Sequence, residues 1–295
     1  MARPAPAANR AVEILNFLAA HPTESFTLSE LAKHLDINGA SMHAVLAVLT
    51  EAGYVVRHVV HRTYSLGPAV VALGAAALER HHGIDLARTE LRRLAAELGV
   101  QVVLTTATTD DIVFLDRAGR YTGTDPSPRV GGRVPLVPPL GTVFLAWAPE
   151  ATVDAWLGRV VDPSPEEYDL HRLSLASVRS VGYAVGLDVA ARGELGRALV
   201  EITDYPHATE LHAKIQALVA RLGHEAYTLR VGDSDRHDVS LVAAPVFGTN
   251  GEVVLAFSAI GFAAPLDAAE IEHIGTVLRR AASRVTDATF GRPPG

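Results

Sequence analysis

The chain has 295 residues, 48% of them hydrophobic, with a net charge of −7 and no cysteine. This length is enough for two domains with separate cores. The absence of cysteine excludes disulfides, thiolate metal sites and cysteine nucleophiles. No run of about eighteen residues lacks charges and helix breakers, so no membrane-spanning segment is predicted. The first residues also lack the apolar core of a signal peptide, so we expect a cytoplasmic protein with a disordered tail over residues 1–8.

The next part of the chain, residues 9–67, predicts a winged helix-turn-helix domain. A first amphipathic helix is expected over residues 10–20. Thr27 and Glu30 have the spacing of a capping box, which opens a second short helix. A third helix is expected over residues 40–52, because turn-forming residues precede it and Gly53 favours a left-handed end. Two short strands that form a hairpin then follow, at residues 54–57 and 62–66.

Helix, turn, helix and hairpin in this order place one helix in a DNA groove. We expect the DNA-facing surface to combine the start of the third helix, the first helix and the hairpin. Its predicted residues are Arg10, Ser41, Met42, His43, Arg57, His58, His61 and Arg62. The alternative is a small helical bundle that serves dimerisation or protein docking, since fold alone does not fix function.

Charge gives this DNA-binding prediction only weak support. Acidic and basic side chains balance over residues 1–80, so the whole net charge of −7 lies beyond Arg80. Histidines at positions 21, 34, 43, 58 and 61 offer hydrogen-bond donors for phosphates. We therefore expect weak non-specific binding and a dependence on two domains acting together. The first helix and the alanine-rich helix from Ala69 are the candidate dimer contacts.

The remainder of the chain predicts a linker and an α+β domain. Residues 68–83 are expected to form a linker helix with a hinge at His81-His82-Gly83, and Asp85 to cap a helix ending at Leu98. Strands separated by turns and helices then alternate in a pattern typical of an antiparallel sheet with flanking helices. The expected strands are 100–106, 112–118, 183–189, 240–247 and 252–260, and the expected helices 140–148, 149–159, 170–181, 207–222 and 267–287. This domain spans residues 84–288, and residues 289–295 form a tail.

Four short motifs in a fixed order resemble the IclR family of bacterial transcriptional regulators. They are Leu28-Ser29-Glu30-Leu31-Ala32, Tyr64-Ser65-Leu66-Gly67-Pro68, Gly182-Tyr183-Ala184 and Ala243-Ala244-Pro245-Val246. The resemblance implies a winged helix followed by a GAF-like effector-binding domain. It also implies a homodimer or dimer of dimers that binds double-stranded operator DNA and a small-molecule effector, with no cofactor.

The sequence departs from the family pattern at positions that matter for ligands. Ala44 replaces the usual arginine of the third helix, and Pro139-Leu140 replaces a Gly-Ala pair whose amides can hold a carboxylate. Proline has no N–H to donate. Burying a carboxylate without donors costs several kcal/mol, so we expect a larger and more apolar effector than a short organic acid, anchored at few points. The predicted effector site contains Leu136, Pro139, Leu140, Gly141, Thr142, Leu241, Val254, Ser258 and Ile260. The alternative is that these residues fill the core and bind nothing.

Residues 190–238 are longer than the family pattern predicts and are interpreted as an insertion. Arg192 and Arg197 lie in it, but nothing in the sequence directs them to the effector site. The chain has no nucleophile elbow, phosphate loop or dinucleotide motif, and its histidine and aspartate clusters lack metal-ligand spacing. We therefore predict neither an enzyme nor a metal site. The hypothesis is a ligand-responsive transcription factor; the alternative is a ligand sensor or docking module whose winged helix no longer binds DNA specifically.

Overall fold

The computed structural model describes residues 5–80, 82–123, 127–160, 164–187, 189–223 and 236–294. It consists of two compact units. The first combines Met1–His81 with Val200–His212, and the second combines His82–Leu199 with Ala213–Gly295. Among the described helices none is long and apolar enough to cross a membrane.

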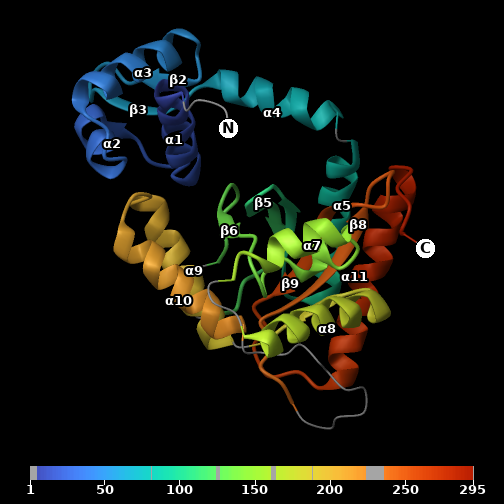
Figure 1. The fold of residues 1–295 in the computed structure, drawn as a ribbon. Coiled ribbons are helices and arrows are strands. Elements are labelled where there is room, and N and C mark those ends of the chain that lie inside the picture. The colour runs from blue at the N-terminus through green and yellow to red at the C-terminus, as the bar shows by residue number, and fades with distance from the viewer. Residues whose placement is uncertain are drawn as a thin grey trace. The chain divides into compact units, whose positions relative to one another are not determined.

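The first unit contains the predicted winged helix-turn-helix (Figure 1). Its elements are α1 (Pro6–Ala20), β1 (Phe26–Thr27), α2 (Leu28–His34), α3 (Gly39–Glu51), β2 (Val55–Arg57), β3 (Thr63–Leu66) and α4 (Pro68–Arg80). Strand β3 lies between β1 and β2, and both pairings are antiparallel. The short sheet holds the wing next to the helices.

Local signals explain where these helices begin and end. Thr27 accepts a hydrogen bond from the backbone N–H of Glu30, and the Glu30 carboxylate accepts one from Thr27, which is the predicted capping box. The Asn38 side chain caps α3 by accepting from the backbone N–H of Ser41 at 2.9 Å. Gly53 follows α3 with φ +75°, a conformation that glycine adopts without a Cβ penalty. The core between the helices contains Ile14, Phe17, Leu18, Leu31, Leu35, Met42, Leu46, Val55 and Tyr64.

Two boundaries differ from the expectation. Helix α1 begins at Pro6, so the predicted disordered tail over residues 1–8 is wrong for residues 6–8. Proline fits the first turn of a helix because a backbone N–H at that position has no partner within the helix. Helix α5 (His82–Leu98) contains His82 and Gly83, which were predicted to form a hinge, and Asp85 lies inside its first turn. His81, the third hinge residue, lies outside the described residues.

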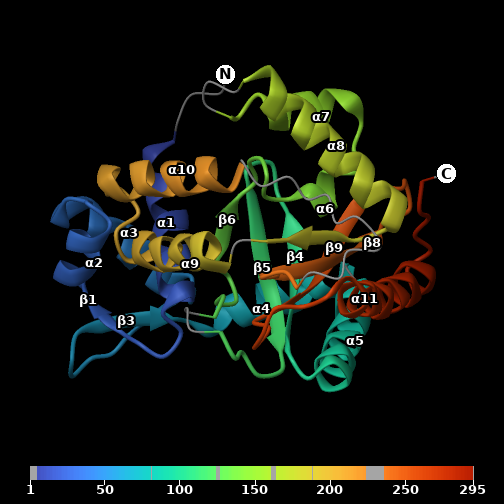
Figure 2. The same cartoon turned by 90° about the horizontal axis from the view of Figure 1, so that it is seen from below.

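The second unit is an α+β domain around one antiparallel sheet of order β6-β5-β4-β9-β8-β7 (Figure 2). After α5, its elements are β4 (Gln101–Ala107), β5 (Asp111–Ala118), β6 (Arg133–Pro135), α6 (Thr142–Leu145), α7 (Glu150–Leu157), α8 (Pro165–Val181), β7 (Ala184–Gly186), α9 (Val189–Asp204), α10 (Thr209–Gly223), β8 (Leu241–Phe247), β9 (Val253–Ile260) and α11 (Ala268–Ala288). The expected fold class is confirmed.

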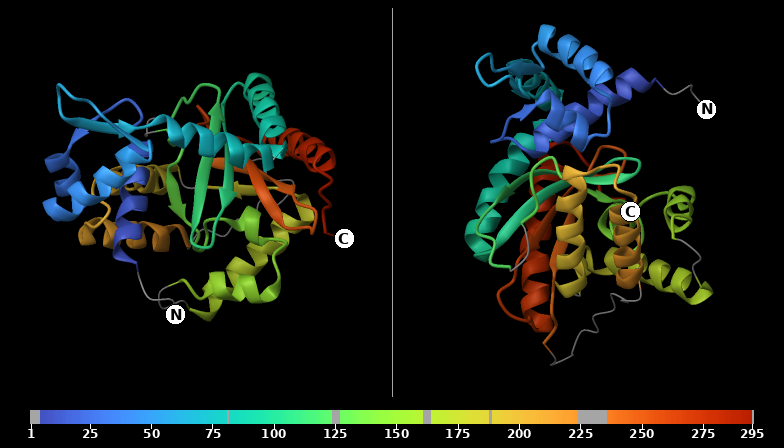
Figure 3. Two further views of the ribbon diagram at one scale, coloured as in Figure 1. Left: turned by 90° about the horizontal axis from the view of Figure 1, so that it is seen from above. Right: turned by 90° about the vertical axis from the view of Figure 1, so that its left-hand side faces the viewer.

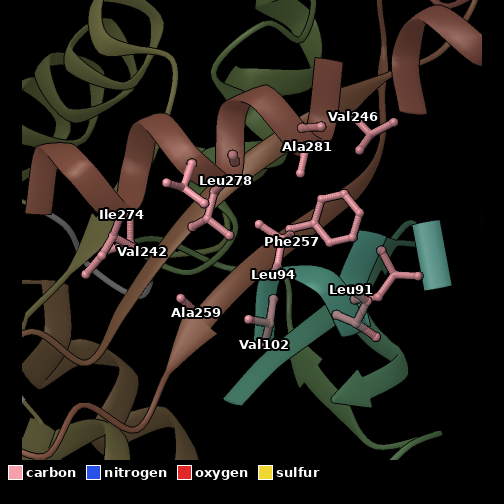
Figure 4. Close-up of a cluster of buried hydrophobic side chains, with 14 of the residues drawn as sticks. Leu91, Leu94, Val102, Val242, Val246, Phe257, Ala259, Ile274, Leu278 and Ala281 are labelled. Carbon is pink, nitrogen blue, oxygen red and sulfur yellow. The ribbon is translucent and has the colours of Figure 1, made fainter. Parts of the chain in front are cut away.

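Helices α5 and α11 cover one face of this sheet. Figure 4 shows Leu94, Phe257 and Leu278 pointing toward one another between the helices and the strands. All three are essentially inaccessible to solvent. Alternate residues of the strands, such as Val102 and Ala259, complete this core, because successive side chains of a strand point to opposite faces. The packing fixes the sheet on one side and leaves its other face for α6, α7, α8 and α9.

The chain leaves the sheet between two paired strands to form a helical hairpin. Strand β7 pairs with β8, and the Ser240 backbone N–H donates to the Gly186 carbonyl at 2.7 Å, yet residues 187–240 separate these ends. Helices α9 and α10 run side by side in this excursion (Figures 2 and 3), and Arg221 pairs with Glu194 across them at 3.1 Å. The sequence predicted α10 within the insertion but not α9. Residues 224–235 are not among those the structure describes.

Candidate functional sites

The exposed side of α3 is the first candidate surface, and it is mostly apolar. Ala40, His43, Ala44 and Val48 lie on it, and the Val48 side chain is 65% exposed. His43 is the single basic residue of this helix. Met42, predicted to face DNA, is fully buried in the core of the unit. That prediction is wrong, because Met42 lies on the opposite side of the helix from the exposed residues.

The remaining predicted DNA-facing residues are accessible. Arg10 donates to the Ser41 hydroxyl at 3.3 Å, which joins α1 to the start of α3. In the wing, the rings of His58 and His61 stack with their centroids 4.8 Å apart. Arg62 is exposed and has φ +53°, unusual for a residue with a side chain.

Arg57, the last of the predicted DNA-facing residues, is exposed at the end of β2. Its guanidinium carbon lies 5.9 Å from the Tyr64 ring centroid, on the neighbouring strand. Guanidinium and imidazole groups on the wing therefore stay available to phosphates, whereas α3 itself offers few polar groups.

Two of the five N-terminal histidines are engaged inside the first unit instead of facing a ligand. His21 is 6% exposed and contacts the Phe17 carbonyl through Nδ1 and an Asp204 carboxylate oxygen through Nε2, both at 2.7 Å. His34 Nδ1 lies 2.8 Å from the Asp204 carbonyl oxygen. His21 is therefore not available to a phosphate, and Nδ1 of His34 is already engaged by Asp204.

A cavity of about 250 Å³ lies in the second unit, on the sheet face opposite α5 and α11. The strand residues that line it alternate with core residues: Val103 and Thr105 from β4, Ala243 from β8, and Ser258 and Ile260 from β9. The loop before α6 and one side of α9 complete its wall. The wall residues of α9 are Val189, Arg192, Gly193, Leu195, Gly196 and Leu199.

Seven of the nine predicted effector-site residues line this cavity: Pro139, Leu140, Gly141, Thr142, Leu241, Ser258 and Ile260. The other two, Leu136 and Val254, do not. Leu136 is buried under the loop, where a Cβ on Gly141 would meet its Cδ1 atom, so it is a core residue. Val254 is displaced by a bulge: Val246 pairs with Leu255 and Phe247 with Val253, which leaves Val254 unpaired on β8 and exposed.

Polar groups in the cavity are few. The hydroxyls of Thr142 and Ser258 have no hydrogen-bond partner among the described residues, and both side chains are largely buried. Burial raises the pKa of the Tyr121 phenol, which also lines the wall, so it stays a protonated donor. Nothing in the sequence placed Arg192 at the effector site, but in the structure it lies in the cavity wall, with Nε donating to the Leu187 carbonyl at 3.0 Å. Arg197 lies elsewhere, near Phe262 and Pro265.

No cluster of histidine and carboxylate side chains within the described residues has the arrangement of a metal site. Among the described residues that line the cavity, no nucleophile is paired with a general base of the kind that covalent catalysis needs. Hydroxyls, one phenol and one guanidinium around an apolar space are groups that can orient a small bound molecule.

Comparison with known proteins agrees with these features. Residues 7–58 match the IclR helix-turn-helix domain. The HTH-type transcriptional regulator BhcR of Paracoccus denitrificans is 30% identical over 112 residues, which are 38% of this chain. The match spans 39% of the length of BhcR.

The fold of the whole chain has solved counterparts. The crystal structure of an IclR transcriptional regulator from Alicyclobacillus acidocaldarius superposes with a TM-score of 0.66 at 24% identity, covering 97% of this chain and 100% of that one. An IclR homologue from Microbacterium hydrocarbonoxydans, complexed with 4-hydroxybenzoate, has a TM-score of 0.62 at 18% identity over 96% and 98% of the two chains. Residues 7–58 therefore form a helix-turn-helix domain of the IclR type, and nearly the whole chain shares the fold of solved IclR regulators.

Proposed function

We propose that the protein is a ligand-responsive transcriptional regulator. Its α3 helix and wing bind operator DNA, and its cavity binds a small, mainly apolar effector. The observation that carries the proposal is the cavity itself: it lies against the sheet of a chain whose N-terminal domain matches a DNA-binding family. Support for the two activities comes from different residues, so each is tested separately.

The proposed DNA surface consists of Arg10, Ser41, His43, Arg57, His58, His61 and Arg62, without Met42. The wing carries its arginines in exposed positions, where each can neutralise one phosphate. His43 is the exposed side chain of α3 that can donate to a base edge. Binding is therefore expected to depend strongly on salt and to have modest sequence preference.

Arg62→Ala tests this surface by fluorescence anisotropy on the DNA that flanks the gene, with salt titrated. Alanine meets the same backbone strain at φ +53° as arginine, so the change isolates the side chain. We expect weaker binding to all sequences and a salt slope reduced by about one. Arg92→Ala, which removes one exposed charge from α5, is the matched control and should leave the slope unchanged. His43→Ala should instead alter which sequence is preferred.

The apolar exposed side of α3 favours a second function, docking of a protein partner without specific DNA binding. Under that function the wild-type chain shows equal, weak affinity for its flanking DNA and for random DNA. Arg62→Ala and Arg92→Ala then have equal effects. A specific, salt-sensitive complex that only Arg62→Ala weakens rejects the docking function.

The effector is proposed to be an apolar or aromatic molecule with at most one acidic group. Thr142 and Ser258 supply hydroxyl groups that can anchor a ligand within apolar walls. Arg192 in the wall can form an ion pair with a single carboxylate. A two-carbon acid such as glyoxylate leaves most of the space unfilled. The relative bound to 4-hydroxybenzoate makes this aromatic acid a sensible first probe.

Thermal-shift measurements with glyoxylate, 4-hydroxybenzoate and longer lipophilic acids distinguish these classes. We expect stabilisation by the aromatic or lipophilic acids and none by glyoxylate. Ser258→Ala should weaken the response, whereas Ser180→Ala, on the exposed side of α8, should not. Strong stabilisation by a two- or three-carbon acid contradicts an apolar site, and no response to any class contradicts effector binding.

Two copies are proposed to act together on DNA, because one domain with few cations does not reach ordinary specific affinity. Exposed apolar side chains on the predicted contact helices support this: Val12 on α1, and Val71 and Leu73 on α4. Val71 is 74% exposed and Leu73 55% exposed, so α4 leaves apolar side chains uncovered. Light scattering that shows a monomer at micromolar concentration, while operator binding stays tight, would overturn this assembly.

A further inference from the structure

The tip of the α9–α10 hairpin belongs to the first compact unit. Residues Val200–His212, which are the end of α9, the turn and the start of α10, join the winged helix-turn-helix in that unit. The rest of α9, residues 189–199, belongs to the second unit. One continuous helix therefore has its two ends in different units.

The tip is held by specific contacts. The Asp204 side chain accepts from His21 Nε2 at 2.7 Å, and its carbonyl accepts from His34 Nδ1 at 2.8 Å. The Tyr205 ring lies 5.1 Å from the His34 ring, measured between centroids. At the edge of this contact, His207 lies 3.8 Å from the Glu13 carboxylate.

The receiving surface is made by aromatic residues from three elements. Phe17 and His21 end α1, Phe26 lies in β1 and His34 ends α2; neighbouring ring centroids are 4.5–5.9 Å apart. Both ring nitrogens of His21 lie 2.7 Å from an oxygen atom, of the Phe17 carbonyl and of the Asp204 carboxylate. This surface lies on α1 and α2 and includes none of the proposed DNA-contact residues.

The other end of the same helix forms part of the cavity wall. Arg192, Leu195 and Leu199 line the space, and so does Gly196. A Cβ added to Gly196 would meet nothing within 4 Å. Because a helix moves as a stiff rod over this length, a molecule that fills the cavity and displaces residues 192–199 also displaces Asp204.

We propose that α9 is the element that transmits effector binding to the DNA-binding domain. Occupancy of the cavity moves α9 outward and breaks the contact of Asp204 and Tyr205 with His21 and His34. This frees the winged helix and changes its affinity for DNA. The inference rests on the proposed function for its effector and its DNA, but the link through α9 can be tested without either.

The first experiment uses the fact that the chain has no cysteine. A Glu13→Cys/His207→Cys double variant, which keeps His21, His34, Asp204 and Tyr205, is treated with a short bis-maleimide, and intramolecular bridging is measured. The same pair is then combined with Gly196→Leu, which fills the cavity from α9, and with Gly196→Ala as the matched control. We expect efficient bridging in the parent pair and with Gly196→Ala, and a fall of about fivefold or more with Gly196→Leu.

Absence of bridging in the parent pair, or equal bridging in all three proteins, overturns the proposal. Circular dichroism and single-cysteine labelling check that the variants fold and that each thiol is reactive. Should Gly196→Leu not fold, Ser258→Leu fills the same cavity from the sheet side and is expected to give the same fall.

The second experiment measures coupling. DNA affinity is determined with and without 4-hydroxybenzoate for the wild type, Asp204→Asn and Glu201→Gln, the last being an exposed position one turn earlier on α9. We expect the probe to shift DNA affinity in the wild type and in Glu201→Gln, but by less than about twofold in Asp204→Asn, which should still bind the probe. A full shift in Asp204→Asn overturns the proposal. If the wild type binds neither DNA nor the probe, the proposed function fails, and the bridging result still decides whether α9 links the cavity to the winged helix.

Discussion

The two faces of the six-stranded sheet are built from the same strands but have opposite properties. Phe257 points into a dry core under α11, whereas Ser258, the next residue, lines the cavity. Leu104 and Thr105 on β4 show the same division. Because successive side chains of a strand point to opposite faces, one of two adjacent residues can stabilise the core while the other contacts a ligand. Changes on the closed face should affect unfolding, and changes on the open face should affect ligands.

The largest expected effect is on the closed face. Phe257→Ala removes a fully buried ring and leaves a hole between α5 and α11, so we expect the free energy of unfolding to fall by about 3–5 kcal/mol. Ser258→Ala should cost about 1 kcal/mol or less, because its hydroxyl has no partner among the described residues. Urea unfolding followed by circular dichroism measures both. Similar losses for the two variants would contradict the division between the faces.

A smaller effect is expected from the ion pair that joins the two helices of the closed face. Arg284 on α11 donates to both carboxylate oxygens of Glu90 on α5, at 3.0 and 2.7 Å, and Arg93 adds a third contact at 2.9 Å. Arg284→Met should lower the free energy of unfolding by about 2 kcal/mol, since it leaves a mostly buried carboxylate short of partners. Arg280→Met, an exposed position on the same helix, is the control and should change it little.

This pair also predicts a dependence on pH. The hydrogen bond from Arg284 holds the pKa of the Glu90 carboxyl below its ordinary value of 4.5. The folded state therefore binds this proton less readily than the unfolded state, so the contribution is present above that value and is lost as the pH falls through the lowered pKa. In Arg284→Met this part of the acid sensitivity should shrink. An unchanged pH profile would show that the pair does not link the helices in solution.

Much of the fold follows from local signals in the sequence. The capping box of Thr27 and Glu30, the left-handed Gly53 and the cap at Asp267 each act within four residues, so the helices they bound could be predicted. Helix α9 was missed because Gly193 and Gly196 interrupt its apolar pattern, and both glycines lie in the wall of the cavity. The glycines in the cavity wall are thus the same residues that obscure the helical pattern of α9 in the sequence.

The candidate sites were only partly predictable, since each depends on which way a side chain points. Met42 and His43 are adjacent, and spacing alone did not show which one enters the core. Val254 follows the strand pattern, but a bulge removes it from the cavity. The contact between His21 and Asp204 joins residues 183 positions apart, which no local pattern specifies. Alternation and capping are local, whereas bulges and long-range contacts appear only in the folded chain.

The smallest expected effect concerns the filled part of the open face, beside the cavity. His171 on α8 is 4% exposed and packs with its ring 6.0 Å from that of Trp156. Burial lowers its pKa from the ordinary value of 6.5, with the Glu167 carboxylate opposing the shift. The unfolded state therefore takes up this proton first, and stability declines as the pH drops below about 6.5.

His171→Gln, which cannot be protonated, should give a flatter stability profile there, whereas His273→Gln, exposed on α11, should keep the wild-type slope. Thermal unfolding at closely spaced pH values compares the three proteins. A steeper acid loss in His171→Gln than in the wild type would mean that the buried ring is charged, and that this part of the open face is not a dry core like the closed one.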